Sequence, residues 1–274
     1  MTAQSRERFA ATLRSERPDL GLACLLIGVE VQPDLDVDAS LADIEELAAD
    51  AAGDVPAGAA PYDTATGLRA ALGDRAGFRG YGDDYDDLRA SLLHEVLRRR
   101  RGLPILLSVV YVEVARRLGL AVAPIGVPGH FVAGVFGAER PVLLDPFAGG
   151  RLISEADLAA RASDATGGPV EVGTDMLRPW STDDVVTRVL GNIRALAAQQ
   201  DLLRVRLWAT DLALLVPHHA LSLRRERGQV LAKMGDFGGA ARDLEDYADA
   251  IEPADEDLAA LARRDAKLVR SRLS

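Results

Sequence analysis

Cysteine is almost absent from this sequence: Cys24 is the only one among 274 residues. A single thiol rules out an intramolecular disulfide and any cysteine-rich metal cluster. Long apolar runs are also missing, because the longest, Leu20–Glu30 and Ile105–Val112, fall far short of the roughly 20 residues that span a bilayer. The opening residues show no apolar segment of the secretory type. We therefore expect a cytoplasmic protein that does not enter a membrane.

Positive charge is in short supply as well. The net charge is −10, although 27% of the residues are charged. Binding to nucleic acid depends on a basic surface that displaces counterions, and anionic membranes attract the same kind of surface. We expect neither as a partner. The hydrophobic fraction of 48% is that of an ordinary folded protein.

The first 150 residues change from helical to strand periodicity. Helices are expected over the apolar segments near residues 9–29, 41–48 and 65–72, and then over Leu88–Arg100 and Ile105–Leu118, with a break at Gly102 and Pro104. Strands are expected over residues 121–127, 131–136 and 142–144, with a hairpin loop at residues 137–140. Helices followed by neighbouring strands predict an α+β domain.

After Pro179 the periodicity is helical only. Five helices are expected: Ser181–Gln200, Leu202–Leu215, Ala220–Met234, Phe237–Ile251 and Asp255–Arg272. Residues 221–253 alternate small and large side chains as a tetratricopeptide repeat does, and residues 201–217 resemble a degraded second copy. We expect one domain over residues 1–165 and a repeat-like helical domain over residues 180–274.

One histidine stands in a position suited to catalysis. His130 follows Pro128-Gly129 at the start of a predicted strand, and Asp145 ends the strand after it. A hairpin centred between residues 138 and 139 pairs positions that sum to about 277, so His130 faces residues 145–147 at the close spacing of opposed strand residues. Such a pair supplies the base and the orienting carboxylate of a catalytic triad. The same two residues also fit a structural histidine and a strand that ends in a turn.

Several motifs occur in the order found in one bacterial family. They are Leu93-His-Glu-Val-Leu-Arg-Arg-Arg-Arg-Gly-Leu-Pro104, Pro128-Gly-His-Phe131 and Leu144-Asp-Pro-Phe-Ala-Gly-Gly150, with Phe78-Arg-Gly80 upstream. With these motifs the chain resembles the bacterial SirB-type proteins. The resemblance implies a papain- or transglutaminase-like α+β core followed by tetratricopeptide repeats. It also implies that His130 and Asp145 match the base and the orienter of the related thiol enzymes.

The nucleophile of those enzymes has no counterpart here. The resemblance places their cysteine near Pro104 or Ile105, and neither can attack a substrate. Cys24 lies in an apolar helix and is expected to be a small buried hydrophobe. Ser108 is the only hydroxyl in the first turn of the central helix, about one turn beyond the expected position, and it needs more activation than a thiol.

Three charged segments also need an interpretation. The arginines of residues 98–101 suit the negative end of a helix dipole and are expected to be solvated, with an acidic peptide as the functional alternative. The acidic residues between 83 and 87 are expected in an exposed loop, since their spacing is not that of a cation site. The pattern Asp34-x-Asp36-x-Asp38 lacks the glycine of a calcium loop, because Ala39 takes its place, so we expect a helix cap.

These features leave three hypotheses. The chain is a non-catalytic, transglutaminase-like protein that binds a protein or peptide; or it is a hydrolase or acyl-transfer enzyme on an amide or ester, with Ser108, His130 and Asp145 as its triad; or it is purely structural. No cofactor and no metal are expected in any of the three, and the sequence does not define an oligomeric state.

Overall fold

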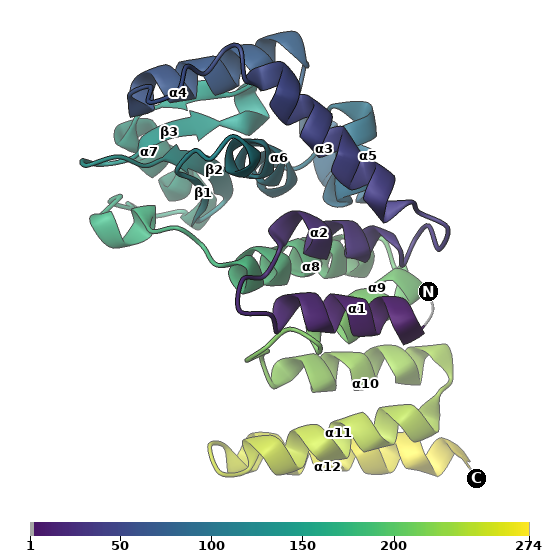
Figure 1. Cartoon of the computed structure of the whole chain (residues 1–274). Helices are drawn as coiled ribbons and strands as arrows, with labels where there is room; N and C mark the ends of the chain where they lie inside the picture. The colour runs from purple at the N-terminus through teal and green to yellow at the C-terminus, as the bar shows by residue number, and fades with distance from the viewer. Residues whose placement is uncertain (1–2, 274) are drawn as a thin grey trace. The chain divides into compact units, whose positions relative to one another are not determined.

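A computed structural model describes residues 3–273 of the chain. It contains two compact units, Met1–Val189 and Leu190–Ser274, which are described separately (Figure 1). The units divide inside one helix, and the expected division into residues 1–165 and 180–274 stays a prediction.

The first unit opens with helices and ends with a small sheet. Its helices are α1 (Ala3–Leu13), α2 (Leu20–Gly28), α3 (Val37–Ala51), α4 (Pro61–Leu68), α5 (Leu93–Arg99), α6 (Pro104–Arg117), α7 (Glu155–Thr166) and the first half of α8 (Thr182–Gln199). Its strands are β1 (Val122–Val127), β2 (His130–Val135), β3 (Val142–Asp145) and β4 (Arg151–Ile153). The mixture confirms the predicted α+β class.

The four strands form an antiparallel sheet in chain order, β1-β2-β3-β4. The β2–β3 ladder pairs Ala133 with Leu144 and Val135 with Val142, so the paired positions sum to 277 as the hairpin arithmetic predicts. Strand β2 is buried along its whole length. One of its faces packs into a core with Leu158 of α7, and α6 packs against β1 and β2 (Figure 1). A strand covered on both faces gives a rigid base for a side chain at its end.

Short helical turns replace part of the expected loops. A π-helical turn, η1 (Arg69–Arg75), continues α4, and 3₁₀ turns occupy η2 (Gly82–Asp86) and η3 (Leu88–Ser91). Helix α5 therefore begins at Leu93, and the expectation of one helix over Leu88–Arg100 was wrong in its first turn. Further 3₁₀ turns are η4 (Pro146–Ala148), η5 (Thr174–Leu177) and η6 (Ser271–Leu273).

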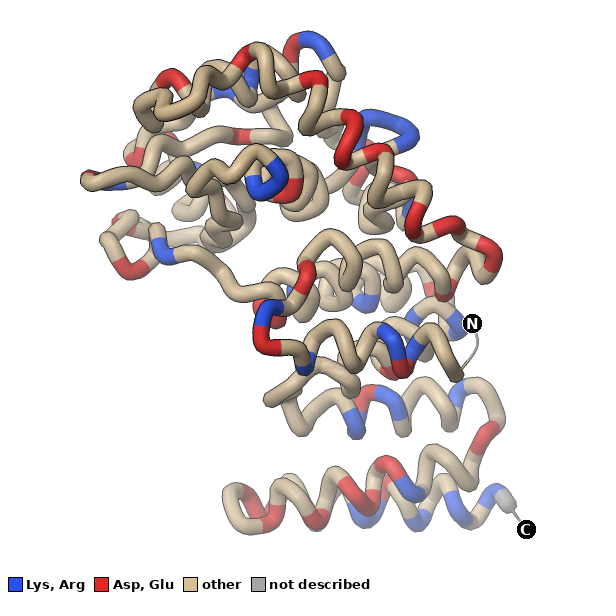
Figure 2. Tube along the Cα trace, viewed as in Figure 1, with Lys and Arg blue, Asp and Glu red and all other residues tan. Residues whose placement is uncertain are grey.

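The second unit is all helical, as predicted. After the end of α8 come α9 (Leu203–Ala213), α10 (Ser222–Met234), α11 (Phe237–Ile251) and α12 (Glu256–Arg270), each packed against the next along the chain from α9 onward. Arg227 of α10 donates to both carboxylate oxygens of Asp243 on α11, at 2.6 Å each. Basic and acidic residues are interspersed along these helices (Figure 2).

Candidate functional site

His130 is held at the tight turn that joins β1 and β2. Gly129 has a φ of +71°, a conformation that glycine adopts without strain, and Val127 pairs with His130 across the ladder. The side chain of His130 is 7% exposed. The turn and the buried strand after it therefore fix the position of the imidazole at the start of β2.

Asp145 ends β3 and begins the turn η4. Its Oδ1 accepts a hydrogen bond from the amide of Ala148 at 3.2 Å, which caps η4. The same oxygen lies 3.1 Å from Nε2 of His130, and the Asp145 side chain is completely buried. The structure thus brings the side chains of His130 and Asp145 into contact, and Asp145 lies within the range of residues that the hairpin arithmetic places near His130.

A third residue, Arg161 of α7, joins this pair. Its Nη1 lies 2.9 Å from Nε2 of His130 and donates to Oδ2 of Asp145 at 2.6 Å. Burial acts most strongly on the Asp145 carboxyl and would raise its pKa, but the neighbouring His130, the charge of Arg161 and the Ala148 amide together lower the pKa. Asp145 is therefore a carboxylate at neutral pH, stabilised by its neighbours.

Sequence reasoning did not find Arg161. The residue lies on a helix whose pattern is ordinary, and nothing around it in the sequence points to a strand 16 residues earlier. One signal was available: a buried carboxylate needs a cation or several donors, and His130 alone is a weak partner when neutral.

Two aromatic rings extend the site. Phe147 of η4 packs edge-on against the ring of His130, with ring centres 6.5 Å apart. Tyr85 of η2 packs against Phe147 at 5.9 Å. Burial raises the pKa of the half-exposed Tyr85 hydroxyl, and the charge of Asp145 acts in the same direction. The phenol therefore stays protonated and is available as a donor.

Ser108, the expected third member of a triad, lies apart from this cluster of contacts. It is fully buried in α6, and its Oγ has no hydrogen-bond partner within the described residues. Cys24 is 1% exposed, and burial raises the pKa of its thiol, with Glu113 and Asp19 adding to the effect. The expectation that Cys24 is a buried hydrophobe is confirmed.

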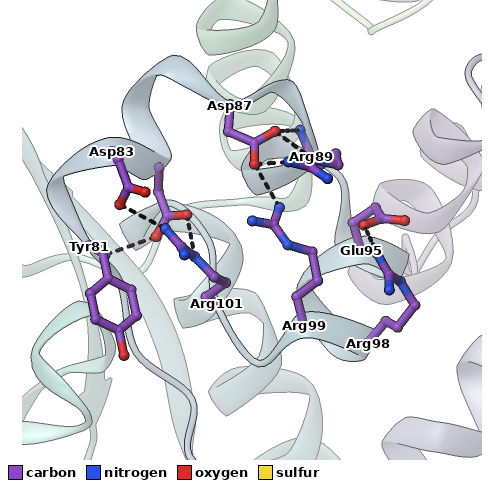
Figure 3. A network of polar contacts seen from close by, with 9 residues as sticks. Tyr81, Asp83, Asp87, Arg89, Glu95, Arg98, Arg99 and Arg101 are labelled. Carbon is purple, nitrogen blue, oxygen red and sulfur yellow. Dashed lines mark hydrogen bonds and ion pairs between the residues drawn. The ribbon is translucent and has the colours of Figure 1, made fainter.

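Two members of the arginine run, Arg99 and Arg101, pair with the acidic segment (Figure 3). Arg98, Asp83 and Asp86 are exposed, as expected of solvated charges. Arg101 donates to Asp84 and to Asp83 at 2.8 Å each, and Asp84 is completely buried. Arg99 lies 2.9 Å from Asp87. The sequence interpretation missed these ion pairs and the burial of Asp84, because it treated each charged segment alone, whereas folding places the two segments side by side.

Among the other candidates, Asp36 accepts a hydrogen bond from the amide of Ala39 and caps α3, so the interpretation as a helix cap is confirmed. In residues 3–273 no group of three His, Cys, Asp or Glu side chains is arranged to hold a metal ion. No helix in the same range is long and apolar enough to cross a membrane.

Comparison with known families agrees with this architecture. A model described as the transglutaminase-like superfamily matches residues 38–191, and a tetratricopeptide repeat model matches residues 193–274. The first match covers more than half of the chain, which therefore belongs to the transglutaminase-like superfamily and carries repeats after that domain.

Within this class the chain is similar to bacterial UPF0162 proteins. One from Xylella fastidiosa (strain Temecula1) is 34% identical over 180 residues, 64% of this chain and 64% of that protein. Another from Pseudomonas aeruginosa is 30% identical over 194 residues, 70% of this chain and 69% of that protein. The match spans less than two thirds of the Xylella protein. The resemblance to SirB-type bacterial proteins is confirmed.

Among solved structures, the chain is similar to menin, in a crystal structure that reveals its binding site for the Mixed Lineage Leukemia protein. The similarity covers 89% of this chain and 68% of menin, with a TM-score of 0.43 and 11% sequence identity.

Proposed function

We propose that this protein is a non-catalytic member of the transglutaminase-like superfamily that binds a protein or peptide. One observation carries the proposal: within residues 3–273 the polar side-chain contacts of the His130 ring are with Asp145 and Arg161, and no thiol or hydroxyl is among them. A general base acts only on a nucleophile within hydrogen-bond reach. His130 and Asp145 then serve binding, not proton transfer.

The start of α6 supports the same proposal. In the related enzymes this helix begins at the reactive cysteine, and here it begins at Pro104, which has no side-chain nucleophile. Ser108 is enclosed without a partner, so it is neither activated by His130 nor open to a substrate.

The repeat unit supports the binding part of the proposal. Tetratricopeptide repeats commonly mediate protein interactions, because stacked helices offer an extended surface. Here a cavity of about 360 Å³ is lined by residues of four helices, α9 to α12: Arg206, Gln229, Ala232, Lys233, Leu244, Asp265, Leu268 and Val269. Leu268 is 59% exposed at this cavity. Lys233 makes no ion pair with the residues that the structure describes, and its ammonium beside the apolar side chains of the cavity suits a peptide with an apolar anchor and an acidic neighbour.

The absence of catalysis is tested with a fluorophosphonate probe, which labels activated serines. We expect the wild-type protein and Ser108→Ala to be labelled equally weakly, with iodoacetamide giving no reaction at Cys24 in the folded state. Labelling of the wild type that Ser108→Ala and His130→Ala abolish would establish the hydrolase alternative with Ser108, His130 and Asp145.

The binding function is tested by selecting peptides from a random library on the full chain. Leu268→Asp should weaken the selected peptides about tenfold or more, because it places a charge where an apolar anchor is buried. Leu261→Asp is the matched control, since Leu261 is 45% exposed on the same helix but does not line the cavity. If Leu268→Asp and Leu261→Asp weaken peptide binding equally, or if no peptide is selected, the cavity is not a peptide-binding site.

A further inference from the structure

The contact among Arg161, His130 and Asp145 restricts where the imidazole can carry its proton. We propose that Arg161 holds His130 with its proton on Nδ1, and that the two residues together form a hydrogen-bond donor site for a carboxylate of a protein or peptide partner. The inference rests on the proposed binding function and names the chemical group that the His130 site would recognise.

The first step concerns Nε2 of His130. A guanidinium has only N–H donors and is always protonated, so in a hydrogen bond across the 2.9 Å between Nη1 of Arg161 and Nε2 of His130 the acceptor is Nε2. Nε2 has one in-plane position, for either a proton or a lone pair. It therefore cannot also donate to Oδ1 of Asp145, which lies 3.1 Å away.

The second step concerns Asp145, which does not need a proton from His130. Its Oδ2 accepts from Arg161 at 2.6 Å and its Oδ1 accepts from the Ala148 amide at 3.2 Å. Both oxygens of this buried carboxylate are satisfied by other donors. The ion pair with Arg161 also balances the charge of the Asp145 carboxylate.

The third step concerns the opposite ring nitrogen. A neutral imidazole that accepts at Nε2 carries its proton on Nδ1. Nδ1 makes no hydrogen bond to the described protein, and it is not among the fully enclosed polar atoms that lack a partner. It is thus a donor with some access to solvent, and since it already carries a proton it cannot act as a base.

The surroundings favour an anionic acceptor. The side chain of Arg161 is 33% exposed, and only its Nη1 is engaged, which leaves donors on the rest of the guanidinium. Phe147 links the ring of His130 to that of Tyr85, whose hydroxyl is another donor, and the positive charge of Arg188 acts on the same hydroxyl. A carboxylate is the peptide group that matches several donors beside a cation.

The tautomer is tested by NMR on the full chain labelled with ¹⁵N-histidine at pH 8, above the usual titration range of histidine. We expect the Nδ1–H form for His130, with His130→Gln identifying its signals. Arg161→Gln should shift His130 toward the Nε2–H form, which then donates to Asp145. Arg140→Gln is the control, because Arg140 pairs with Glu155 on the same helix α7.

An Nε2–H tautomer in the wild-type protein would overturn the inference, and so would an unchanged tautomer in folded Arg161→Gln. The wild-type measurement decides the matter even if Arg161→Gln does not fold. Neither result depends on the serine-reactive probe, so failure of this inference and failure of the non-catalytic proposal are distinguishable.

The ligand is tested with three peptides: acetyl-trialanine as the free acid, the same peptide as its amide, and acetyl-Ala-Glu-Ala amide. We expect a carboxylate peptide to move the His130 signals and the trialanine amide to leave them unchanged. Arg161→Gln should weaken the binding about tenfold or more, the usual effect of losing a charged hydrogen bond. Response to the free acid alone assigns a chain terminus, and response to the glutamate peptide assigns a side chain. Equal binding of acid and amide, or no response to either carboxylate, would refute the donor site.

Discussion

At the scale of single residues, the turn that follows Asp145 depends on its close packing against Tyr111. Gly149 and Gly150 follow η4 with φ values of +69° and +76°. A Cβ at Gly150 would lie 2.5 Å from the hydroxyl of Tyr111, whereas a Cβ at Gly149 would meet nothing within 4 Å. Tyr111 is completely buried in α6, and its hydroxyl has no partner among the described residues. The turn after Asp145 is therefore packed directly on the central helix.

These two glycines allow backbone strain to be separated from packing. We expect Gly149→Ala to lower the free energy of unfolding by about 1 kcal/mol, the cost of a side chain at positive φ. Gly150→Ala should cost about 1–3 kcal/mol more, because it also collides with Tyr111. Tyr111→Phe should recover part of that difference in Gly150→Ala and none in Gly149→Ala. Urea denaturation measures the free energy of unfolding of Gly149→Ala and Gly150→Ala, each alone and combined with Tyr111→Phe. Equal losses for the two glycine variants would argue against the contact between residue 150 and Tyr111.

His94 provides a pH-dependent prediction. The residue is 9% exposed, and its Nδ1 has no hydrogen-bond partner between residues 3 and 273. Burial is the main reason that its pKa lies below the ordinary value, with Arg98 contributing and Glu95 opposing. The unfolded chain therefore binds a proton more readily than the folded one, so stability is full above about pH 6.5 and falls as the pH drops from there toward the folded pKa.

The measurement is the free energy of unfolding between pH 8 and pH 5. The decline on acidification should be smaller in His94→Gln than in the wild type. His218→Asn serves as the control, because His218 is exposed and asparagine tolerates its φ of 56°. If the free energy of unfolding falls in parallel in His94→Gln and the wild type, the buried imidazole is not the source of the pH dependence.

At the scale of elements, an ion pair between Asp84 and Arg101 joins the turn η2 to the segment that follows α5. Asp84 accepts from the Tyr81 amide and from Arg101 at 2.8 Å each, and the guanidinium of Arg101 lies over the ring of Tyr81 (Figure 3). The same turn carries Tyr85, which packs on Phe147 beside His130. The ion pair thus helps to set one wall of the site.

Removing one partner of the ion pair between Arg101 and Asp84 should lower the free energy of unfolding. Arg101→Met leaves Asp84 buried without its cation and should lower the free energy of unfolding by about 3 kcal/mol, whereas Asp84→Asn should cost less. Asp83→Asn is the matched control, since Asp83 also contacts Arg101 but is 77% exposed, so its loss should change little. Thermal unfolding followed by circular dichroism ranks the three variants by their loss of stability. A large loss in Asp83→Asn would contradict the prediction.

At the scale of the whole molecule, the sequence predicts best what depends on local periodicity. The five helices after Pro179 agree closely with α8 to α12, and the register of β2 and β3 follows from the length of one loop. Helix α7, strand β4 and the burial of Asp84 were not anticipated. The capping box of Ser154 and Asp157 is a local signal for α7. The contact from Arg161 to Asp145 and the burial of Asp84 join distant segments, and a pattern read along one stretch contains no information about them.

The beginning of α6 has a consequence beyond its missing thiol. Because Pro104 occupies the first position of this helix, that position has no amide hydrogen. Hydrolytic enzymes of many folds stabilise the oxyanion of a tetrahedral intermediate with backbone amides near the attacking atom. Under the proposed non-catalytic function, the proline at residue 104 therefore accounts for two missing capacities at once: a reactive side chain and one backbone donor to a developing negative charge.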